Sequence, residues 1–193
     1  YSKVNNWWIA LKIAVLIKPG DININNIPHS DDSSIDLYRV LINRSTEKMD
    51  TNYSFYKNVN VGESCQVCLE LINKGYEVTI NIGCFDSLTE KEIELICSNV
   101  SNINGIKAIY LADTYGSGNN KNIPIQLHKF YKELEKYQIN IPFGFHSHNN
   151  NEDALSKTST AIYHGCTMID SCIGGLGRGA GNLKSEQLMA YLY

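Results

Sequence analysis

Short apolar segments alternate with longer amphipathic segments along almost the whole chain. The strand-like segments are 8–16, 35–41, 77–82, 107–112, 141–145 and 167–173. The helix-like segments are 61–75, 87–102, 123–137, 152–164 and a last one from 184, while a polar loop over 19–34 stands in the place of a first helix. Strands separated by helices of this length form parallel sheets with crossover helices. The alternation therefore predicts an α/β fold built on one parallel sheet.

Signals at the helix ends support this division. Gly75 follows the first helix-like segment and is suited to the left-handed conformation that ends a helix. Ser87 and Glu90 have the spacing of a capping box. We expect the second helix to begin at Ser87.

The composition is that of an ordinary globular chain and excludes several classes of function. With 193 residues and 43% hydrophobic content, the chain can bury a core as one domain over 1–193. A net charge of −3 gives no electrostatic case for binding nucleic acid or an acidic membrane. The apolar stretch 7–17 is too short to span a bilayer and lacks a signal-peptide cleavage pattern.

The cysteines indicate a reducing compartment. The six thiols are scattered, mostly within apolar segments, as reduced core cysteines are in the cytosol. Cys65 and Cys68 form a CxxC, but no second pair answers it at zinc-ribbon spacing, so we do not expect a structural zinc there. We expect a cytoplasmic protein.

Two histidines stand at the end of one strand-like segment. Residues 144–148 read Gly-Phe-His-Ser-His and follow the apolar run 141–145. In a strand, side chains at i and i+2 point to the same face. His146 and His148 should therefore project into one space, as two ligands of a single metal ion would. The alternative is one packed and one solvated histidine.

Three polar clusters follow strand-like segments directly. They are Asp113-Thr114, the histidine pair, and the glycine-rich loop 174–182. Closed barrels and open doubly wound sheets both place their chemistry at the carboxyl ends of strands. Three strand ends converge more easily in a barrel, which we therefore favour over the open sheet.

These segments resemble a known family. Residues 109–116 (Ile-Tyr-Leu-Ala-Asp-Thr-Tyr-Gly), 144–150 (Gly-Phe-His-Ser-His-Asn-Asn) and 174–182, with Glu186 behind them, look like the HMG-CoA lyase-like or DRE-TIM metallolyases. That superfamily includes 4-hydroxy-2-oxovalerate aldolase, 3-hydroxy-3-methylglutaryl-CoA lyase and the isopropylmalate synthases. The resemblance covers roughly 77–192, and the loop Gly-Leu-Gly-Arg-Gly-Ala-Gly-Asn is most similar to the aldolase branch. It implies a TIM (β/α)8 barrel of the aldolase type.

The resemblance also implies a divalent metal ion. Mn²⁺ or Mg²⁺ is expected, with Zn²⁺ less favoured, and its ligands would be two strand histidines and an aspartate. The histidines map onto His146 and His148, and Asn182 matches a glycine-loop asparagine that serves as a further ligand. Imidazole, carboxylate and water also suit such a metal on chemical grounds.

A small-molecule 2-oxo acid is the implied substrate. Thr114 falls where family members place a hydroxyl near the substrate carboxylate, and His146, Gly177 and Arg178 complete the expected substrate site. Asp113 is expected to orient a ligand rather than to bind the metal. The alternative interpretations, without a role in substrate binding, are a tight turn at the barrel rim for the glycine loop and a solvent-facing side chain for Arg178.

The chain departs from the family pattern at the metal-binding aspartate. That residue lies in an Arg-Asp pair on the first barrel strand, and here Arg39, Arg44 and Arg178 are followed by Val, Ser and Gly. We therefore expect about six of the eight strands, with the N-terminal part of the barrel absent. A fragment, an incomplete record and a degenerate relative each explain this; the fragment is favoured because the chain begins with Tyr1. The general base should then lie outside this chain, and the fragment alone should be inactive.

The reaction implied is aldol cleavage or formation. A 4-hydroxy-2-oxo acid would give pyruvate and an aldehyde through a metal-bound enolate. The alternatives are an acyl-CoA-condensing synthase of the isopropylmalate synthase type and a non-catalytic barrel relative. A second copy of the chain and an aldehyde dehydrogenase are the protein partners that the resemblance leaves open, whereas His128 and His164 fall in helices and are not expected in the site.

Overall fold

A computed structural model describes residues 11–43 and 60–193, and its centre is one six-stranded sheet. The strands are β1 (Ala14–Ile17), β2 (Leu37–Ile42), β3 (Glu77–Ile82), β4 (Ile106–Asp113), β5 (Phe143–Ser147) and β6 (Met168–Asp170). They lie in chain order, and every neighbouring pair is parallel. The predicted parallel α/β architecture is confirmed. Residues 8–10 of the first predicted strand lie outside the described residues.

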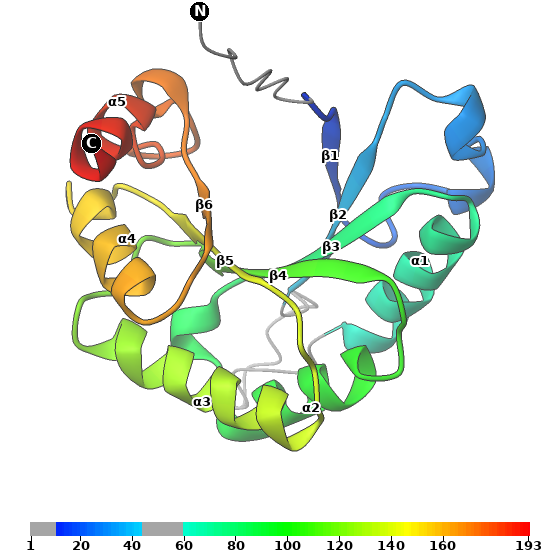
Figure 1. Cartoon of the computed structure of the whole chain (residues 1–193), viewed down its shortest axis with the longest axis horizontal. Coiled ribbons are helices and arrows are strands. Elements are labelled where there is room, and N and C mark those ends of the chain that lie inside the picture. The colour runs from blue at the N-terminus through cyan, green and yellow to red at the C-terminus, as the bar shows by residue number, and fades with distance from the viewer. Residues whose placement is uncertain (1–10, 44–59) are drawn as a thin grey trace, which may run out of the picture.

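The helices cover the outer side of this sheet. They are α1 (Val61–Asn73), α2 (Glu90–Val100), α3 (Asn122–Lys136), α4 (Ala154–Tyr163) and α5 (Ser185–Leu192). Figure 1 shows the sheet bent into an open curve, with α1 to α4 along its convex face and a gap between β1 and β6. The sheet is therefore a half-barrel of the TIM type, as predicted.

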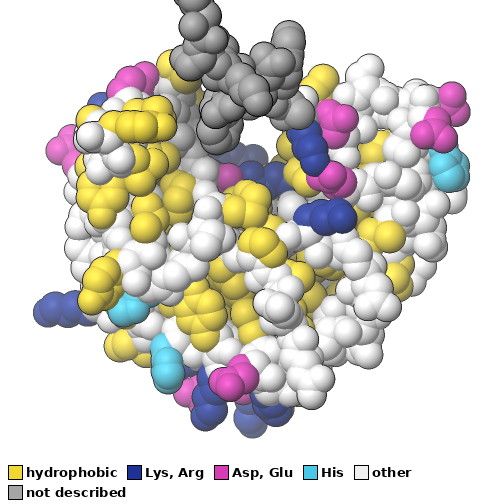
Figure 2. Space-filling model, viewed as in Figure 1, with side chains coloured by type: hydrophobic (Ala, Val, Ile, Leu, Met, Phe, Trp, Pro, Cys, Tyr) yellow, Lys and Arg dark blue, Asp and Glu magenta, His cyan; other side chains and the backbone are white. Residues whose placement is uncertain are grey.

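The two faces of the sheet differ in polarity. In β2, Tyr38, Val40 and Ile42 are buried, and they share one apolar core with helix residues such as Leu71 and Phe130. The alternate residues of β2, which face the concave side, are only half-buried. The hydrophobic effect thus drives the helices onto the convex face. Acidic and basic side chains gather around the hollow between the two ends of the sheet (Figure 2).

A contact between side chains of β2 and β6 shows that the sheet is strongly curved. Arg39 of β2 binds Asp170 of β6, with nitrogen–oxygen distances of 2.7 and 3.0 Å. Four strand spacings separate β2 from β6, which is about 19 Å in a flat sheet. The contact therefore spans the concave face, and the interior of the half-barrel is closed enough for opposite strands to touch.

Several predicted boundaries were wrong. Strand β6 spans only Met168–Asp170 instead of the predicted 167–173, and Ile173 begins a 3₁₀ turn. The capping box of α2 is formed by Thr89 and Glu92, not by Ser87 and Glu90. Ser87 instead ends a short 3₁₀ turn and donates its hydroxyl to the carbonyl of Cys84. Strand β5 runs to Ser147 rather than ending at Phe145, so His146 lies within the strand.

The two cysteines of the CxxC pattern are free, buried thiols. Cys65 and Cys68 lie on the core side of α1, and burial raises their pKa to about 11 and about 12. Such thiols are inert core residues rather than thiolate ligands. Among the described helices, none is long and apolar enough to cross a membrane.

Candidate metal site at the carboxyl end of the sheet

The two histidines lie together at the carboxyl end of β5. His146 occupies the fourth position of the strand, and His148 follows its last residue. Both side chains are half-buried, and their ring centroids are 5.1 Å apart at an interplanar angle of 74°. The intervening Ser147 is buried and bonds Thr158 of α4 at 2.8 Å. The strand alternation therefore sends both imidazoles away from the helix layer.

A carboxylate orients the ring of His146. Its Nδ1 lies 2.9 Å from Oδ2 of Asp170. Burial alone would raise the pKa of Asp170, but hydrogen bonds from His146 and Arg39, together with the charge of Arg39, lower it overall. An ionised carboxylate accepts only, so Nδ1 carries the proton and Nε2 is the ring nitrogen that faces away from the carboxylate and can ligate a metal ion. This is the arrangement in which a histidine ligates a metal.

Arg39 joins this carboxylate to the rest of the concave face. Its guanidinium grips both oxygens of Asp170, donates to Oδ1 of Asn81 at 3.0 Å, and lies 4.1 Å from the ring centroid of Tyr110. Side chains from β2, β3, β4, β5 and β6 thus form one polar network. Arg39, Asn81, Tyr110 and Asp170 were not predicted as site residues. A charge inside an otherwise apolar strand, as at Arg39 and Asp170, is the signal that could have identified them.

The electrostatic surroundings of His148 favour its neutral form. Burial lowers its pKa, and the neighbouring His146, Lys157 and Arg178 lower it further, against the opposing effect of Asp113. A neutral imidazole is the form that binds a metal.

Asn182 is brought beside His148 by the glycine loop. The two residues form an isolated antiparallel bridge, with Asn149 N donating to Gly181 O at 2.8 Å and Leu183 N to Ser147 O at 3.3 Å. The amide Nδ2 of Asn182 donates to Leu176 O at 2.8 Å, which fixes the side chain. Its Oδ1 is buried and has no hydrogen-bond partner within the described residues. A buried amide oxygen without a partner is costly, and a bound cation would satisfy it.

The glycine loop needs its glycines for close packing. A Cβ on Gly177 would overlap the side chain of Asn182. Gly181 has φ +90°, and a Cβ there would overlap Gly175 O. The amides of Gly174, Gly175 and Gly181 are already bonded within the protein, to Glu186, Cys172 and Arg178 respectively. The side chain of Arg178 is exposed.

Thr114 and Asp113 lie at the adjacent end of β4, but neither is bonded to a histidine ring. The hydroxyl of Thr114 accepts from the amide of Cys84 at 2.9 Å, which ties β4 to the end of β3. Asp113 is fully buried and binds Nζ of Lys157 at 2.7 Å on the helix side of the sheet. Lys157 is a further residue that was not predicted; it lies on the buried face of α4 with Ala154 and Ala161.

The described residues contain no cluster of three His, Cys, Asp or Glu side chains that could hold a metal ion. They do offer two oriented imidazoles and a buried amide oxygen. These groups fit a divalent cation that takes mixed nitrogen and oxygen ligands and completes its shell elsewhere.

The chain is similar to a group of aldolases. A 4-hydroxy-2-oxovalerate aldolase of Bacillus cereus is 28% identical over 182 residues, which are 94% of this chain and 47% of that protein. The corresponding enzyme of Carboxydothermus hydrogenoformans is 36% identical over 88 residues, 46% of this chain and 25% of that protein. The chain spans about half the length of the curated relatives it matches.

Solved structures show the same fold. Hydroxymethylglutaryl-CoA lyase of Pseudomonas aeruginosa superposes with a TM-score of 0.67 at 16% identity, over 94% of this chain and 62% of that one. The carboxyl transferase domain of Rhizobium etli pyruvate carboxylase superposes with the same TM-score at 13% identity, over 94% and 30%. The HMGL-like family itself matches residues 22–193, and the chain belongs to this family.

Proposed function

We propose that this chain carries the metal and 2-oxo-acid site of a lyase that cleaves a 4-hydroxy-2-oxo acid into pyruvate and an aldehyde. The named relatives are 4-hydroxy-2-oxovalerate aldolases, and the observation that carries the proposal is the arrangement of His146, His148 and Asn182. Two half-buried imidazoles lie at one rim of the half-barrel beside Asn182, whose buried amide oxygen has no hydrogen-bond partner among residues 11–43 and 60–193. The whole barrel-type domain, of which 1–193 supply these strands, would be the catalytic unit.

The chain's own groups would divide the work of metal binding. His146 would ligate through Nε2, because Asp170 occupies Nδ1. His148 and Oδ1 of Asn182 would ligate beside it. A divalent ion held there, Mn²⁺ or Mg²⁺, would polarise the 2-oxo group and stabilise the negative charge that develops as the C3–C4 bond breaks.

The remaining steps are proton transfers and substrate orientation. The 4-hydroxyl loses its proton as the aldehyde forms, and C3 gains a proton to become the methyl group of pyruvate. No described residue is assigned as the base. Arg178, exposed on the glycine loop, would attract the substrate carboxylate, and Thr114 and Gly177 would line its position. Asp113 would act indirectly, through Lys157.

An aldol assay on the full-length protein tests the proposal. Pyruvate release from 4-hydroxy-2-oxovalerate is measured with Mn²⁺, after removal of metal by chelation, and after its return. We expect metal-dependent release that is lost in His146→Ala and retained in His128→Ala, a change at an exposed position on α3. Release of free coenzyme A from acetyl-CoA and a 2-oxo acid, with no aldol cleavage, would replace the aldolase with a condensing synthase. Activity that survives chelation and the His146 change would overturn the proposal.

A further inference from the structure

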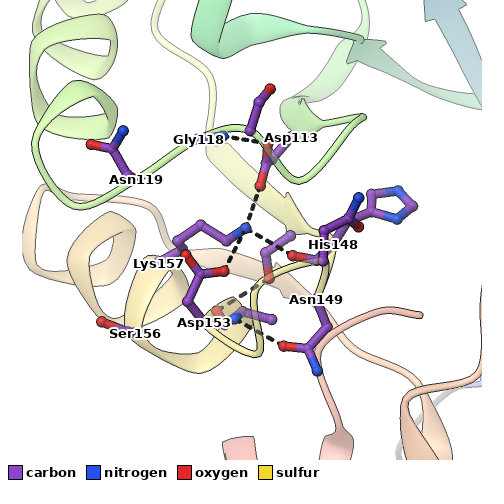
Figure 3. A network of polar contacts seen from close by, with 12 residues as sticks. Asp113, Gly118, Asn119, His148, Asn149, Asp153, Ser156 and Lys157 are labelled. Atoms are coloured by element: carbon purple, nitrogen blue, oxygen red, sulfur yellow. Dashed lines mark hydrogen bonds and ion pairs between the residues drawn. The ribbon is translucent and has the colours of Figure 1, made fainter. Parts of the chain in front are cut away.

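Helix α4 carries a lysine whose side chain has no exposed surface. The ammonium of Lys157 lies 2.7 Å from Oδ2 of Asp113 and 3.0 Å from Oδ1 of Asp153, and it donates to the carbonyl oxygen of His148 at 2.8 Å. Figure 3 shows the contacts of the lysine nitrogen with Asp113, Asp153 and the backbone of His148. An ammonium has three N–H donors and three acceptors surround this one. The contacts with Asp113 and His148 are hydrogen bonds, whereas the contact with Asp153 is an ion pair without hydrogen-bond geometry.

Asp113 is the fully buried carboxylate that balances the charge of Lys157. Asp113 is as completely buried as Lys157, and its second oxygen accepts the amide of Gly118 at 2.9 Å. A buried charge is tolerated only when it is paired and hydrogen-bonded. The position of the lysine nitrogen is therefore fixed by the β4 end and by the turn after it. It serves as a rigid donor rather than a mobile one.

That donor holds one end of a particular peptide group. The unit joining His148 to Asn149 has its oxygen on Lys157 and its nitrogen on Gly181 O, at 2.8 Å each. The parallel sheet does not supply these bonds, because the β4–β5 ladder ends at Ser147 and the β5–β6 ladder ends at His146. The bond of the peptide nitrogen belongs to the isolated bridge between His148 and Asn182. The orientation of this peptide sets the backbone of His148 and hence the direction of its ring. Lys157 fixes it from the helix layer, and the glycine loop fixes it from the rim.

We propose that Lys157 is a positioning residue for the second histidine: its buried cation, anchored by Asp113, aims His148 into the metal site. The functional importance of the His148 ring rests on the proposed metal site. The way in which Lys157 holds the peptide between His148 and Asn149 does not depend on that proposal. A nucleophilic role for this lysine, such as an imine with a keto acid, does not fit a nitrogen without exposed surface and with three oxygen neighbours.

The test compares matched variants of the full-length protein. Lys157→Met combined with Asp113→Asn removes the cation together with its fully buried partner, so that no fully buried carboxylate is left without its cation. The other carboxylate beside Lys157, Asp153, is 30% exposed and can be hydrated. Lys74→Met is the control, because Lys74 also donates to a backbone carbonyl at 2.8 Å, that of Ile27 in the segment between β1 and β2. Mn²⁺ affinity is measured by calorimetry with the metal alone. We expect the paired change to weaken binding about 10- to 100-fold and the control to change it less than about twofold.

A double-mutant cycle separates positioning from general destabilisation. In a His148→Ala background, the paired change should weaken Mn²⁺ binding no further, because the ligand it positions is gone. In a His146→Ala background it should still do so. Equal losses in both backgrounds, or unchanged affinity in the paired variant, would overturn the proposal.

A metal-free readout keeps the two proposals distinguishable. Amide hydrogen exchange at Asn149, the other end of the held peptide, should accelerate by about tenfold or more in the paired variant and not in Lys74→Met. If the wild-type protein binds no Mn²⁺, the proposed function fails, and the exchange result alone decides whether Lys157 holds the peptide. Unchanged exchange at Asn149 would overturn the positioning role whatever the metal does.

Discussion

His146 lies in β5 and His148 directly follows that strand, yet networks on opposite faces of the sheet hold the two residues. The ring of His146 is bound directly by Asp170, in a concave-face network whose ion pair with Arg39 is 19% exposed at each partner. His148 is held through its backbone carbonyl by Lys157, in a convex-face network where both Lys157 and Asp113 are fully buried. The first network fixes the ring orientation of His146 through its Nδ1, and the second fixes the backbone orientation at His148. Solvent reaches one and not the other, so the two should respond differently to mutation and to pH.

The largest effect on stability should come from the buried network. Lys157→Met alone leaves Asp113 charged and unpaired in the core, which should lower the free energy of unfolding by about 3–5 kcal/mol. Urea unfolding followed by circular dichroism measures this. Adding Asp113→Asn should recover most of the loss; a loss below about 1 kcal/mol in the single variant would mean that the pair is not buried as described.

Breaking the concave network should cost less. Arg39→Met leaves Asp170 hydrogen-bonded to His146 and removes the bond from Arg39 to Asn81. Because this site is partly hydrated, we expect a loss of about 1–3 kcal/mol in the same urea experiment. A loss equal to that of Lys157→Met would erase the distinction between the two networks.

Low pH should weaken the concave-face network, because it protonates Asp170. The pKa of Asp170 is held below its ordinary value of 3.8 in the folded protein, so the unfolded chain binds more protons as the pH falls. The stabilisation from its partners is therefore present above pH 3.8 and lost progressively below it. Between pH 5 and pH 3, wild-type protein should lose more unfolding free energy than Arg39→Met, in which this carboxyl has a pKa closer to ordinary. Parallel acid profiles for the two proteins would contradict this account of Asp170.

Asn182 should affect binding more than stability. Asn182→Ala removes one hydrogen bond, to Leu176 O, and also removes a buried oxygen without a partner in the described residues. The two contributions oppose each other, so unfolding free energy should change by less than about 1 kcal/mol. Mn²⁺ affinity should nevertheless fall measurably in calorimetry. A large stability loss would show that Oδ1 has a structural partner instead.

The last and smallest expected effect is the slow chemical labelling of cysteine thiols that are buried in the apolar core. Burial raises the pKa of Cys65 to about 11 and that of Cys68, Cys97 and Cys166 to about 12. Alkylation by iodoacetamide at pH 8, followed by peptide mass spectrometry, should therefore label these four slowly until urea is added, and the half-buried Cys172 sooner. Rapid labelling of Cys68 in the native protein would contradict the packing of α1.

The sequence predicted the scaffold better than the connections across it. Hydrophobic alternation is a local property, so the strands, their parallel order and the strand-end position of His146 and His148 could be predicted. The contact of Arg39 with Asp170 joins residues 131 positions apart and depends on how far the sheet curves, which no local pattern encodes. Lys157 was missed for a similar reason. Its position on the buried face of α4 is visible in the spacing of Ala154 and Ala161, but its partner Asp113 lies on another strand.

The boundary errors have local causes. Ser87 and Thr89 both begin an S/T-x-x-E pattern, and the choice between them was made by the 3₁₀ turn at Phe85–Ser87, which engages the hydroxyl of Ser87. The polar tail of β5 reads as a loop in sequence. It is a strand because β4 and β6 supply its backbone partners on either side as far as His146.

Manganese binding by the full-length protein tests the central claim most directly. Calorimetry would compare wild type, His146→Ala/His148→Ala and the control His128→Ala/His164→Ala, whose two histidines are exposed, each with and without oxalate, a planar mimic of the pyruvate enolate. The account predicts Mn²⁺ binding that oxalate strengthens, that the site variant loses and that the control variant keeps. Binding that persists in the site variant, or its absence from the folded wild-type protein, would contradict a metal site at the end of β5.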